Sequence, residues 1–257
     1  MKIATWNVNS LKVRLPHVID WLNNHQPDIL CLQETKLIDD HFPLNDINAL
    51  GYHCLFSGQK TYNGVAILSK LAGNDRILDI PQFSDEQKRV ISATYGDLRV
   101  VCVYVPNGES VESAKYQYKL QWLTALKQWL QQELIRYERL IVLGDFNIAP
   151  EDRDVYDPDA WRDKVLCSQP ERDALNGLIG LGLKDSFRLF EQPEKSYTWW
   201  DYRMMAFRLN RGLRIDHILI SDELTKDCSA CSIDKQPRKL ERPSDHAPVI
   251  VEFKVKG

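Results

Sequence analysis

The sequence predicts an α+β protein built as a four-layer sandwich, in which two packed, mostly antiparallel β-sheets are flanked by helices. Short apolar runs rich in β-branched residues recur along the 257 residues, and most of them are separated by turn-forming residues. Only three or four good helical patterns lie between these runs. Strands joined mainly by turns fit stacked sheets. A doubly wound parallel sheet is the alternative.

Nine segments are predicted to be strands. Each is short and apolar, contains β-branched residues and is bounded by residues that favour turns. Polar residues follow several of them directly, which favours the sandwich because such residues then collect at one edge of a sheet. The segments are Lys2–Trp6, Asp28–Gln33, Tyr52–Ser57, Gly64–Ser69, Val90–Tyr95, Leu98–Val105, Leu140–Leu143, Arg214–Ile220 and Val249–Lys254.

Two helices are indicated by apolar residues at helical spacing. The first follows Ser10, which we expect to cap it, and the second is longer. Pro27 and Gly182 stand where these or later helices should stop. The apolar positions are Leu15, Val18, Ile19 and Leu22 in the first helix, and Tyr116, Leu120, Leu123, Leu126, Leu130 and Leu134 in the second.

Composition is that of a globular protein of enzyme size. Hydrophobic residues make up 44% and charged residues 27%, and the net charge is −3. This excludes a disordered, collagenous or disulfide-stapled chain, and no linker divides residues 1–257, so we expect a single domain. There is no export signal, no apolar stretch near the length of a membrane span and no polybasic tail. We therefore expect a cytoplasmic protein without membrane attachment.

The six cysteines favour a reducing compartment. Cys31, Cys54 and Cys102 lie inside apolar runs, where a free thiol behaves as a small hydrophobic group. Cys228 and Cys231 form a C-x-x-C pair, but there is no second pair and no histidine at ligand spacing. Two unlinked thiols are therefore favoured over redox or zinc chemistry.

Acidic and amide side chains follow five apolar segments. Any one of them could be a turn or a structural carboxylate. Together they favour a site, because half-buried carboxylates repel one another unless a cation, a proton or hydrogen bonds compensate. Oxygen ligands without several Cys or His select magnesium or manganese over zinc. The residues are Asn7 and Asn9, Glu34, Asp145 and Asn147, Asp216, and the pair Asp245 and His246.

An arginine-rich and aromatic stretch from Tyr197 to Arg214 favours a nucleic-acid partner. Guanidinium groups contact phosphates, and aromatic or methionine side chains stack on or wedge beside bases. In the alternative interpretation, Trp199 and Trp200 are partly core residues beside a solvated loop. Lys115 and Lys119 are predicted to lie on the exposed side of the long helix, where they extend the basic surface or simply face solvent. The arginines are Arg203, Arg208, Arg211 and Arg214.

Ordered motifs over essentially the whole chain resemble the exonuclease III family of DNA-repair nucleases, within the endonuclease/exonuclease/phosphatase superfamily. Secreted deoxyribonucleases, inositol phosphatases and sphingomyelinases share some of these motifs, but their sequences do not resemble this chain in the segments between the shared motifs. The motifs are ATWNVNSL, DILCLQETK, GYHCLFSGQKTYNGVAI, VYVPNGE, SAKYQYKLQWL, LGDFNIAPEDRDVYDP, YTWWDYR, GLRIDHIL and ERPSDHAPV.

The resemblance implies a role for each matching residue. Asp145 orients or deprotonates the attacking water, and His246, with its tautomer fixed by Asp216, donates to a phosphate oxygen. Asn147 bonds the scissile phosphate, and Tyr104 acts on the phosphate or the leaving group. The implied metal set is Asn7, Glu34, Asp145, Asn147, Asp245 and His246. The implied DNA-binding residues are Lys36 and Asn107, Trp199 and Leu213 at positions that resemble the family's damage pocket, and Arg203, Arg208 and Arg211 on a loop that would enter the minor groove. Gly64 is a further matching position, and His217 is expected to be structural.

The activity that the resemblance implies is magnesium-dependent hydrolysis of double-stranded DNA, with manganese as a possible substitute. It would cut 5′ to abasic sites and remove nucleotides or blocking groups from 3′ ends, acting as a monomer on nucleoid DNA. The alternative is a specialist for 3′ ends with minor abasic-site activity, and the loop from Val165 to Ser168 together with Leu213 sets the balance. A third possibility is a noncatalytic DNA-binding protein of the same fold.

Overall fold

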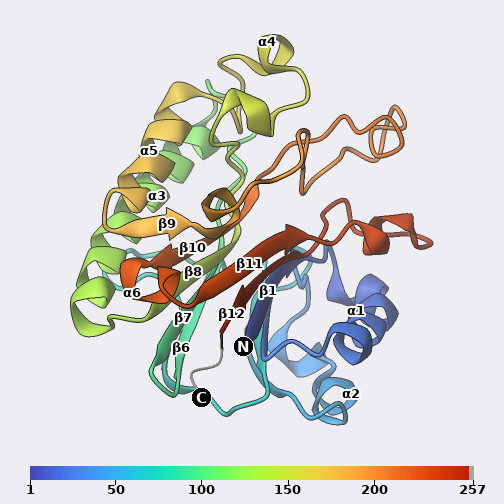
Figure 1. Cartoon of the computed structure of the whole chain (residues 1–257), viewed down its shortest axis with the longest axis vertical. Helices are drawn as coiled ribbons and strands as arrows, with labels where there is room; N and C mark the ends of the chain where they lie inside the picture. Colours follow the sequence, from blue (N-terminus) through green and yellow to red (C-terminus); the bar gives the residue numbers. More distant parts are fainter. Residues whose placement is uncertain (255–257) are drawn as a thin grey trace.

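Two six-stranded sheets pack face to face in the computed structural model, which describes residues 1–254 (Figure 1). Only the pairs β1–β2 and β7–β8 are parallel, so the mostly antiparallel sandwich is confirmed and the doubly wound parallel sheet is wrong. The first sheet has the order β11 (Cys228–Ile233), β12 (Val249–Phe253), β1 (Lys2–Asn7), β2 (Ile29–Gln33), β4 (Val65–Ser69), β3 (His53–Ser57). The second has β5 (Asn74–Ile77), β6 (Val90–Tyr95), β7 (Leu98–Tyr104), β8 (Leu140–Asp145), β10 (Asp216–Ser221), β9 (Leu183–Asp185).

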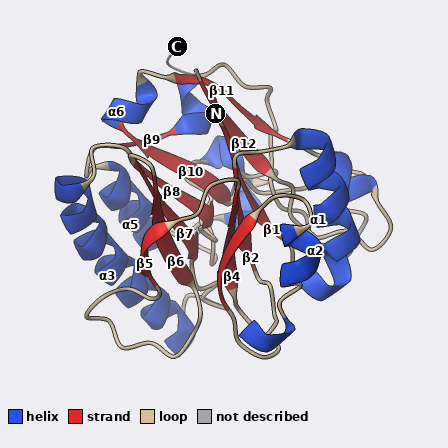
Figure 2. Cartoon of the chain, turned by 90° about the horizontal axis from the view of Figure 1, so that it is seen from below, coloured by secondary structure: helices blue, strands red, loops and turns tan. Residues whose placement is uncertain are grey.

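Helices cover the outer face of each sheet, as Figure 2 shows. Helices α1 (Leu11–His25) and α2 (Leu44–Asn48) pack on the first sheet, and α3 (Ala114–Arg136) and α5 (Gln169–Ile179) pack on the second. The remaining short elements are α4 (Pro158–Trp161), α6 (Asp222–Thr225), and the 3-10 turns Asp39–His41, Asp152–Asp154, Ser186–Leu189 and Gln236–Lys239.

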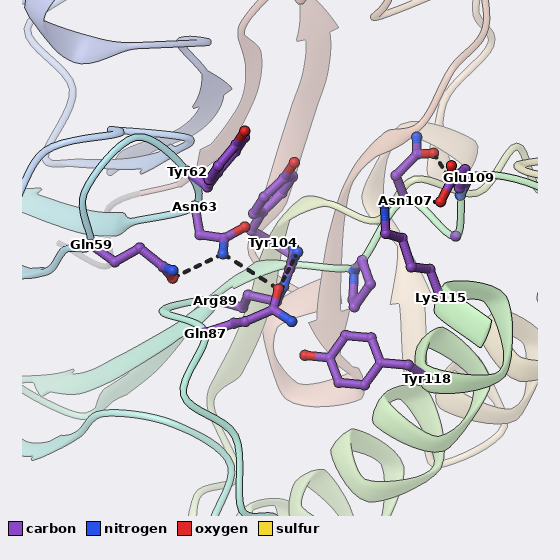
Figure 3. A pocket seen from close by; sticks show the side chains of 12 residues that line it. Gln59, Tyr62, Asn63, Gln87, Arg89, Tyr104, Asn107, Glu109, Lys115 and Tyr118 are labelled. Carbon is purple, nitrogen blue, oxygen red and sulfur yellow. Dashed lines mark hydrogen bonds and ion pairs between the residues drawn. The ribbon is translucent and has the colours of Figure 1, made fainter. Parts of the chain in front are cut away.

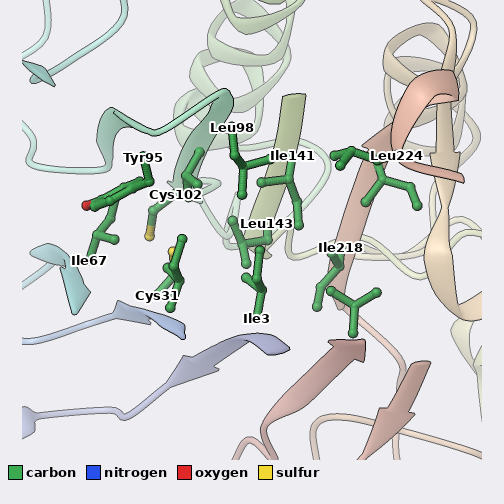
Figure 4. Packing of buried hydrophobic residues seen from close by; sticks show 14 of the residues in the cluster. Ile3, Cys31, Ile67, Tyr95, Leu98, Cys102, Ile141, Leu143, Ile218 and Leu224 are labelled. Carbon is green, nitrogen blue, oxygen red and sulfur yellow. The ribbon is translucent and has the colours of Figure 1, made fainter. Parts of the chain in front are cut away.

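The central core lies between the two sheets. In Figure 4, Ile3 and Cys31 of the first sheet face Cys102 and Ile141 of the second. Because successive side chains of a strand point to opposite faces, the alternate residues of the same strands pack against the helices outside. Both faces of the central strands are therefore buried, which explains why these strands read as nearly continuous apolar runs.

All nine predicted strands are present, with ends that differ by at most two residues. The segment predicted from Arg214 begins as a strand only at Asp216, because the preceding backbone N–H groups bond to loop residues: that of Arg214 to the carbonyl of Asp154, and that of Ile215 to the hydroxyl of Thr198. Strands β5, β9 and β11 are missing from the prediction. All three lie at sheet edges. An edge strand has a neighbouring strand on one side only, so the apolar pattern that marks a strand in the sequence is weaker there.

The helix ends agree with the predicted signals only in part, and the cap of the long helix was not predicted. Ser113 caps α3 by accepting the backbone N–H of Tyr116 at 3.1 Å. Ser10 precedes α1 as expected, but its φ of 89° directs the side chain away and it makes no capping hydrogen bond. Helix α1 ends through Gln26 in the left-handed conformation, one residue before Pro27.

The cysteines are all unlinked, as expected for the C-x-x-C pair. Within residues 1–254, no helix combines the length and the apolar character that crossing a membrane requires.

The two lysines of α3 differ in exposure. Lys115 is exposed and pairs with Glu109 at 2.9 Å. The prediction that Lys119 is exposed is wrong, because its side chain is fully buried against α5 and forms an ion pair with Glu171. Lys119 lies three residues after Tyr116 and four before Leu123, on the apolar face of the helix, but this spacing does not show that a glutamate of a second helix pairs with it.

A second buried ion pair fastens α3 to the sheet. The Nε of Arg99 lies 2.6 Å from Oε2 of Glu133, and both side chains are 1% exposed. We expect Arg99→Met to lower the free energy of unfolding by about 3–5 kcal/mol, because it leaves the Glu133 carboxylate buried without its partner. Urea denaturation followed by circular dichroism measures this. Lys115→Met, which removes an exposed pair, should change the value by less than about 1 kcal/mol; equal effects of the two variants would contradict the assignment.

Candidate active site

Strand register in the second sheet places three predicted site residues in one row. Tyr104 of β7 is paired with Asp145 of β8, and Asp145 is paired with Asp216 of β10. The residue before Asp145 must be glycine, since a Cβ at Gly144 would lie 1.8 Å from the carbonyl oxygen of Val103. The close parallel pairing of β7 and β8 therefore fixes where the Asp145 carboxylate emerges.

The first sheet contributes Asn7 and Glu34 at the ends of β1 and β2. The Asn7 amide nitrogen donates to Oε1 of Glu34 at 2.8 Å and to Oδ2 of Asp145 at 2.9 Å, so it joins the two sheets. Its oxygen accepts the backbone N–H of Asn9. In this orientation Asn7 serves the carboxylates as a hydrogen-bond donor, and it does not present its oxygen as the predicted metal ligand.

Left-handed backbone conformations are concentrated at this edge. Non-glycine residues adopt them at a cost and keep them where surrounding contacts enforce them, often at functional sites. The backbone N–H of Ser10 bonds to the carbonyl of Glu34 at 2.8 Å, and that of Lys36 to the carbonyl of Asn63 at 2.9 Å. The residues concerned are Asn9, Ser10, Glu34, Lys36 and Asn147.

His246 is held between two carboxylates. Its Nδ1 lies 2.9 Å from Oδ2 of Asp216, and its Nε2 lies 3.8 Å from Oδ2 of Asp145. Burial alone would lower the pKa of His246, but the charges of Asp216 and Asp145 more than offset it and raise the pKa to about 10. The ring is therefore a hydrogen-bond donor at neutral pH. The predicted partnership of Asp216 with His246 is present in the structure.

A divalent cation fits between Glu34 and Asp145. Ligand atoms of these two residues and of His246 all lie within 4.8 Å of one another. Burial raises the pKa of Asp145 to about 7, as expected for a carboxylate without sufficient positive charge nearby. Oδ1 of Asp216 is also buried without a hydrogen-bond partner among the described residues. The two carboxylates suit a hard cation, and Nε2 of His246 faces them while its Nδ1 is bonded to Asp216.

Asp245 and Asn147 lie beside this group. Asp245 accepts the side-chain N–H groups of Asn9 and Trp199, each at 2.9 Å, and is outside the three-residue metal cluster. Asn147 donates to Oδ2 of Asp145 at 3.2 Å. As oriented, the amide group of Asn147 faces the centre as a donor, whereas Asp245 supports the residues that surround His246.

Two predicted DNA contacts belong to the site itself. The ammonium of Lys36 lies 2.8 Å from Oε2 of Glu34, and the exposed Asn107 donates to Oδ1 of Asn147 at 3.1 Å. Three arginines lie apart from them, exposed on the segment that projects beyond the sheets in orange in Figure 1. They are Arg203, Arg208 and Arg211.

A polar cavity of about 620 Å³ opens beside Tyr104 (Figure 3). Asn63 and Gln87 are hydrogen-bonded on one wall, and the guanidinium of Arg89 lies 4.6 Å from the Tyr104 ring centre. Burial raises the pKa of Tyr104 well above its ordinary value, so the phenol stays protonated. Sequence reasoning missed Asn63, Gln87 and Arg89. The available signal was the polar, turn-forming composition of residues 58–64 between two predicted strands.

The base of the arginine-rich segment is buried. The interpretation of Arg214 as a phosphate contact is wrong: its side chain is 1% exposed and lies 2.7 Å from Asp154 and 2.8 Å from Asp185. Trp200 is also fully buried, as the core interpretation held. Nδ1 of His217 accepts a hydrogen bond from Arg214 in the interior, which agrees with its expected structural role.

Trp199 and Leu213 form part of an apolar cluster at the edge of the site. Trp199 is half-buried and bridges to His246 and to Leu213, which is fully buried beside it. Leu166 packs in the same cluster with a φ of 75°, a conformation that favours glycine. The loop from Val165 to Ser168 therefore fills space behind Trp199.

The site combines groups that suit attack of water on an anionic centre. Asp145 is a buried carboxylate able to accept a proton, and His246 is a fixed donor for developing negative charge. Glu34 and Asp145 supply oxygen ligands for a cation. All lie at one edge, within reach of a single phosphate.

Comparisons with known proteins agree with this chemistry. The model of the Endonuclease/Exonuclease/phosphatase family matches residues 4–246. Exodeoxyribonuclease III of Haemophilus influenzae is 38% identical, covering 99% of this chain and 100% of that protein. A 3′ phosphatase from Neisseria bound to a product DNA hairpin is 49% identical with a TM-score of 0.98, and an AP endonuclease from Archaeoglobus fulgidus is 40% identical with a TM-score of 0.95. In both comparisons, the aligned region covers 99% of this chain and 100% of the solved structure's chain.

Asp185, which pairs with Arg214 at the base of the arginine-rich segment, should titrate in acid. Burial alone would raise the pKa of Asp185, but the charges of Arg214 and His217 outweigh it, so the pKa lies below its ordinary value. Its contribution to stability is therefore present above the unfolded pKa of about 3.9 and is lost as pH falls through the lower folded value. At pH 7, we expect Asp185→Asn to have a lower free energy of unfolding than the wild-type protein. Below pH 4, its free energy of unfolding should fall less than that of the wild type, and urea denaturation measures both. The exposed Asp159→Asn is the control; a wild-type acid dependence in Asp185→Asn would refute the prediction.

Proposed function

The chain belongs to the endonuclease/exonuclease/phosphatase family, and on that premise we propose that it is a metal-dependent DNA-repair phosphodiesterase of the exonuclease III type. It cuts double-stranded DNA 5′ to abasic sites, as base excision repair requires, and removes nucleotides or blocking groups from 3′ ends. The observation that carries this proposal is the convergence of Glu34, Asp145 and the His246–Asp216 pair from both sheets on one point.

The roles of the residues follow from their hydrogen bonds. Asp145 takes a proton from water as the water oxygen attacks phosphorus in line and the bond to the 3′ oxygen breaks. His246, oriented by Asp216, donates to a non-bridging oxygen, and Asn147 binds the same phosphate. Tyr104, a neutral phenol, donates to the phosphate or to the departing oxygen.

Glu34 and Asp145 are the residues that would hold the metal ion, for which Mg²⁺ is our first choice and Mn²⁺ the second. When bound, the ion neutralises charge on the phosphate and on the leaving oxygen. Lys36 is paired with Glu34 and offsets part of the charge of that carboxylate.

The DNA lies across the edge that carries these residues. The cavity beside Tyr104 offers Arg89 and Asn63 to a flanking phosphate, and the exposed arginines of the projecting segment reach the backbone further along. Met204 and Met205, 79% and 62% exposed at the tip, are suited to wedge in the minor groove. We further propose that the protein acts as a monomer in the cytoplasm, on the nucleoid.

One observation favours the alternative, a specialist for 3′ ends. Leu166 and Leu213 fill the space behind Trp199, where an extruded abasic sugar would have to enter. The chain is also similar to a 3′ phosphatase over 99% of its length. Relative rates on abasic and 3′-blocked substrates decide between the two candidates.

We expect the purified protein to cleave a duplex that carries one tetrahydrofuran abasic analogue and one recessed 3′ end when Mg²⁺ is present, and not in EDTA. Denaturing gels resolve the two products. Asp145→Asn, which keeps the shape of the side chain, should lower both rates by about 10²–10⁴-fold if Asp145 is the general base. If neither the abasic analogue nor the 3′ end is cleaved in a metal-dependent way, the nuclease assignment is overturned. If only the 3′ end is shortened, the result selects the 3′-end specialist.

Leu166→Gly should raise incision at the abasic analogue relative to 3′-end cleavage. Glycine removes the side chain behind Trp199 and accepts the left-handed backbone without strain. The same gels measure the ratio of the two rates. Leu175→Ala, which opens the core beneath α5 away from the site, is the control; a ratio unchanged in Leu166→Gly would show that this loop does not set specificity.

A further inference from the structure

The buried ammonium of Lys119 is bonded to the backbone behind the site. It donates to the carbonyl oxygen of Asn147 at 2.7 Å, to that of Asn107 at 3.1 Å, and to Oε1 of Glu171. A lysine has three N–H donors, and all three are used. The side chain is fully buried, so no water competes for these bonds.

Glu171 extends the connection to the loop that fills the space behind Trp199. Its Oε1 also accepts the backbone N–H of Leu166 at 3.0 Å, and its Oε2 accepts that of Ser168 at 3.1 Å. One ion pair therefore holds three chain segments, which contain Asn107, Asn147 and Leu166, around the same edge of the second sheet.

Asn147 is fixed from both ends by this arrangement. Its backbone is in the left-handed conformation, with a φ of 50°. The carbonyl points inward to Lys119, the side-chain amide nitrogen donates to Asp145 and to the carbonyl oxygen of Val105, and the amide oxygen accepts from Asn107. Loss of the inward bond would remove one of the restraints that keep the amide in place beside Asp145.

We propose that Lys119 is a positioning residue, which holds the backbone of Asn147 and Asn107 so that the amide of Asn147 stays aimed at the scissile phosphate. The inference rests on the proposed function, because it assigns Lys119 a part in that reaction without contact to the substrate. Stability alone does not require the pair, since buried ion pairs can often be replaced by apolar residues at little cost. The pair Arg99–Glu133, which joins the same helix to the sheet about 20 Å further along, provides the comparison.

The first experiment compares Lys119→Met with Arg99→Met in steady-state cleavage of the duplex described above, at a temperature where circular dichroism shows both variants folded. We expect kcat of Lys119→Met to fall about 10- to 100-fold, as misplaced catalytic groups cause, with KM changed by less than about threefold. Arg99→Met should keep the wild-type kcat. A wild-type kcat in Lys119→Met, or equal losses in both variants, would overturn the proposal.

Two further variants separate positioning from folding. If Lys119 acts through Asn147, the double variant Lys119→Met/Asn147→Ala should be no slower than Asn147→Ala alone, whereas additive losses would overturn this route. Lys119→Met/Glu171→Leu removes both charges and should fold, yet should stay slow; restored kcat there would show that the pair is only structural. An inactive wild-type protein would instead refute the proposed function.

Discussion

The side-chain amide of Asn7 joins the two sheets at the edge where the site lies. Its two N–H bonds go to a carboxylate from each sheet, Glu34 and Asp145. Two buried like charges would otherwise separate the sheets, since each carboxylate is costly to desolvate and repels the other. The amide offsets part of that cost, together with the Lys36 ammonium on Glu34 and the ring of His246 beside Asp145, so the packing of the sandwich and the geometry of the candidate metal site depend on the same contact.

The position of this edge follows from the two parallel strand pairs. The ends of β1 and β2 in one sheet and of β7 and β8 in the other bring Asn7, Glu34, Tyr104 and Asp145 to neighbouring positions. The chain then turns sharply through left-handed residues that backbone hydrogen bonds enforce. Rigid strands and strained turns together give short side chains a fixed geometry, which in-line attack on a phosphate needs.

Buried charge is distributed in three ways around the site. Asp216 holds His246 as an imidazolium, Arg214 anchors the projecting segment, and Lys119 ties loop backbone behind Asn147. None of these charges faces solvent, so each acts through the group that it holds. The exposed arginine and methionine side chains of the projecting segment lie apart from these buried charges.

The sequence by itself determined the layered fold, nine strands and the polar residues that meet at one edge of the sheets, because apolar periodicity and polar residues after strand ends are local signals; Tyr104 came only from the family resemblance. Only the tertiary structure decided that Arg214 and Lys119 are buried, that Asn7 presents its amide nitrogen to the carboxylates, and that β5, β9 and β11 are strands. Those outcomes depend on which elements cover a residue or pair with an edge. Such neighbours are distant in sequence, and an arginine on a solvated loop reads the same as one that neutralises two buried aspartates.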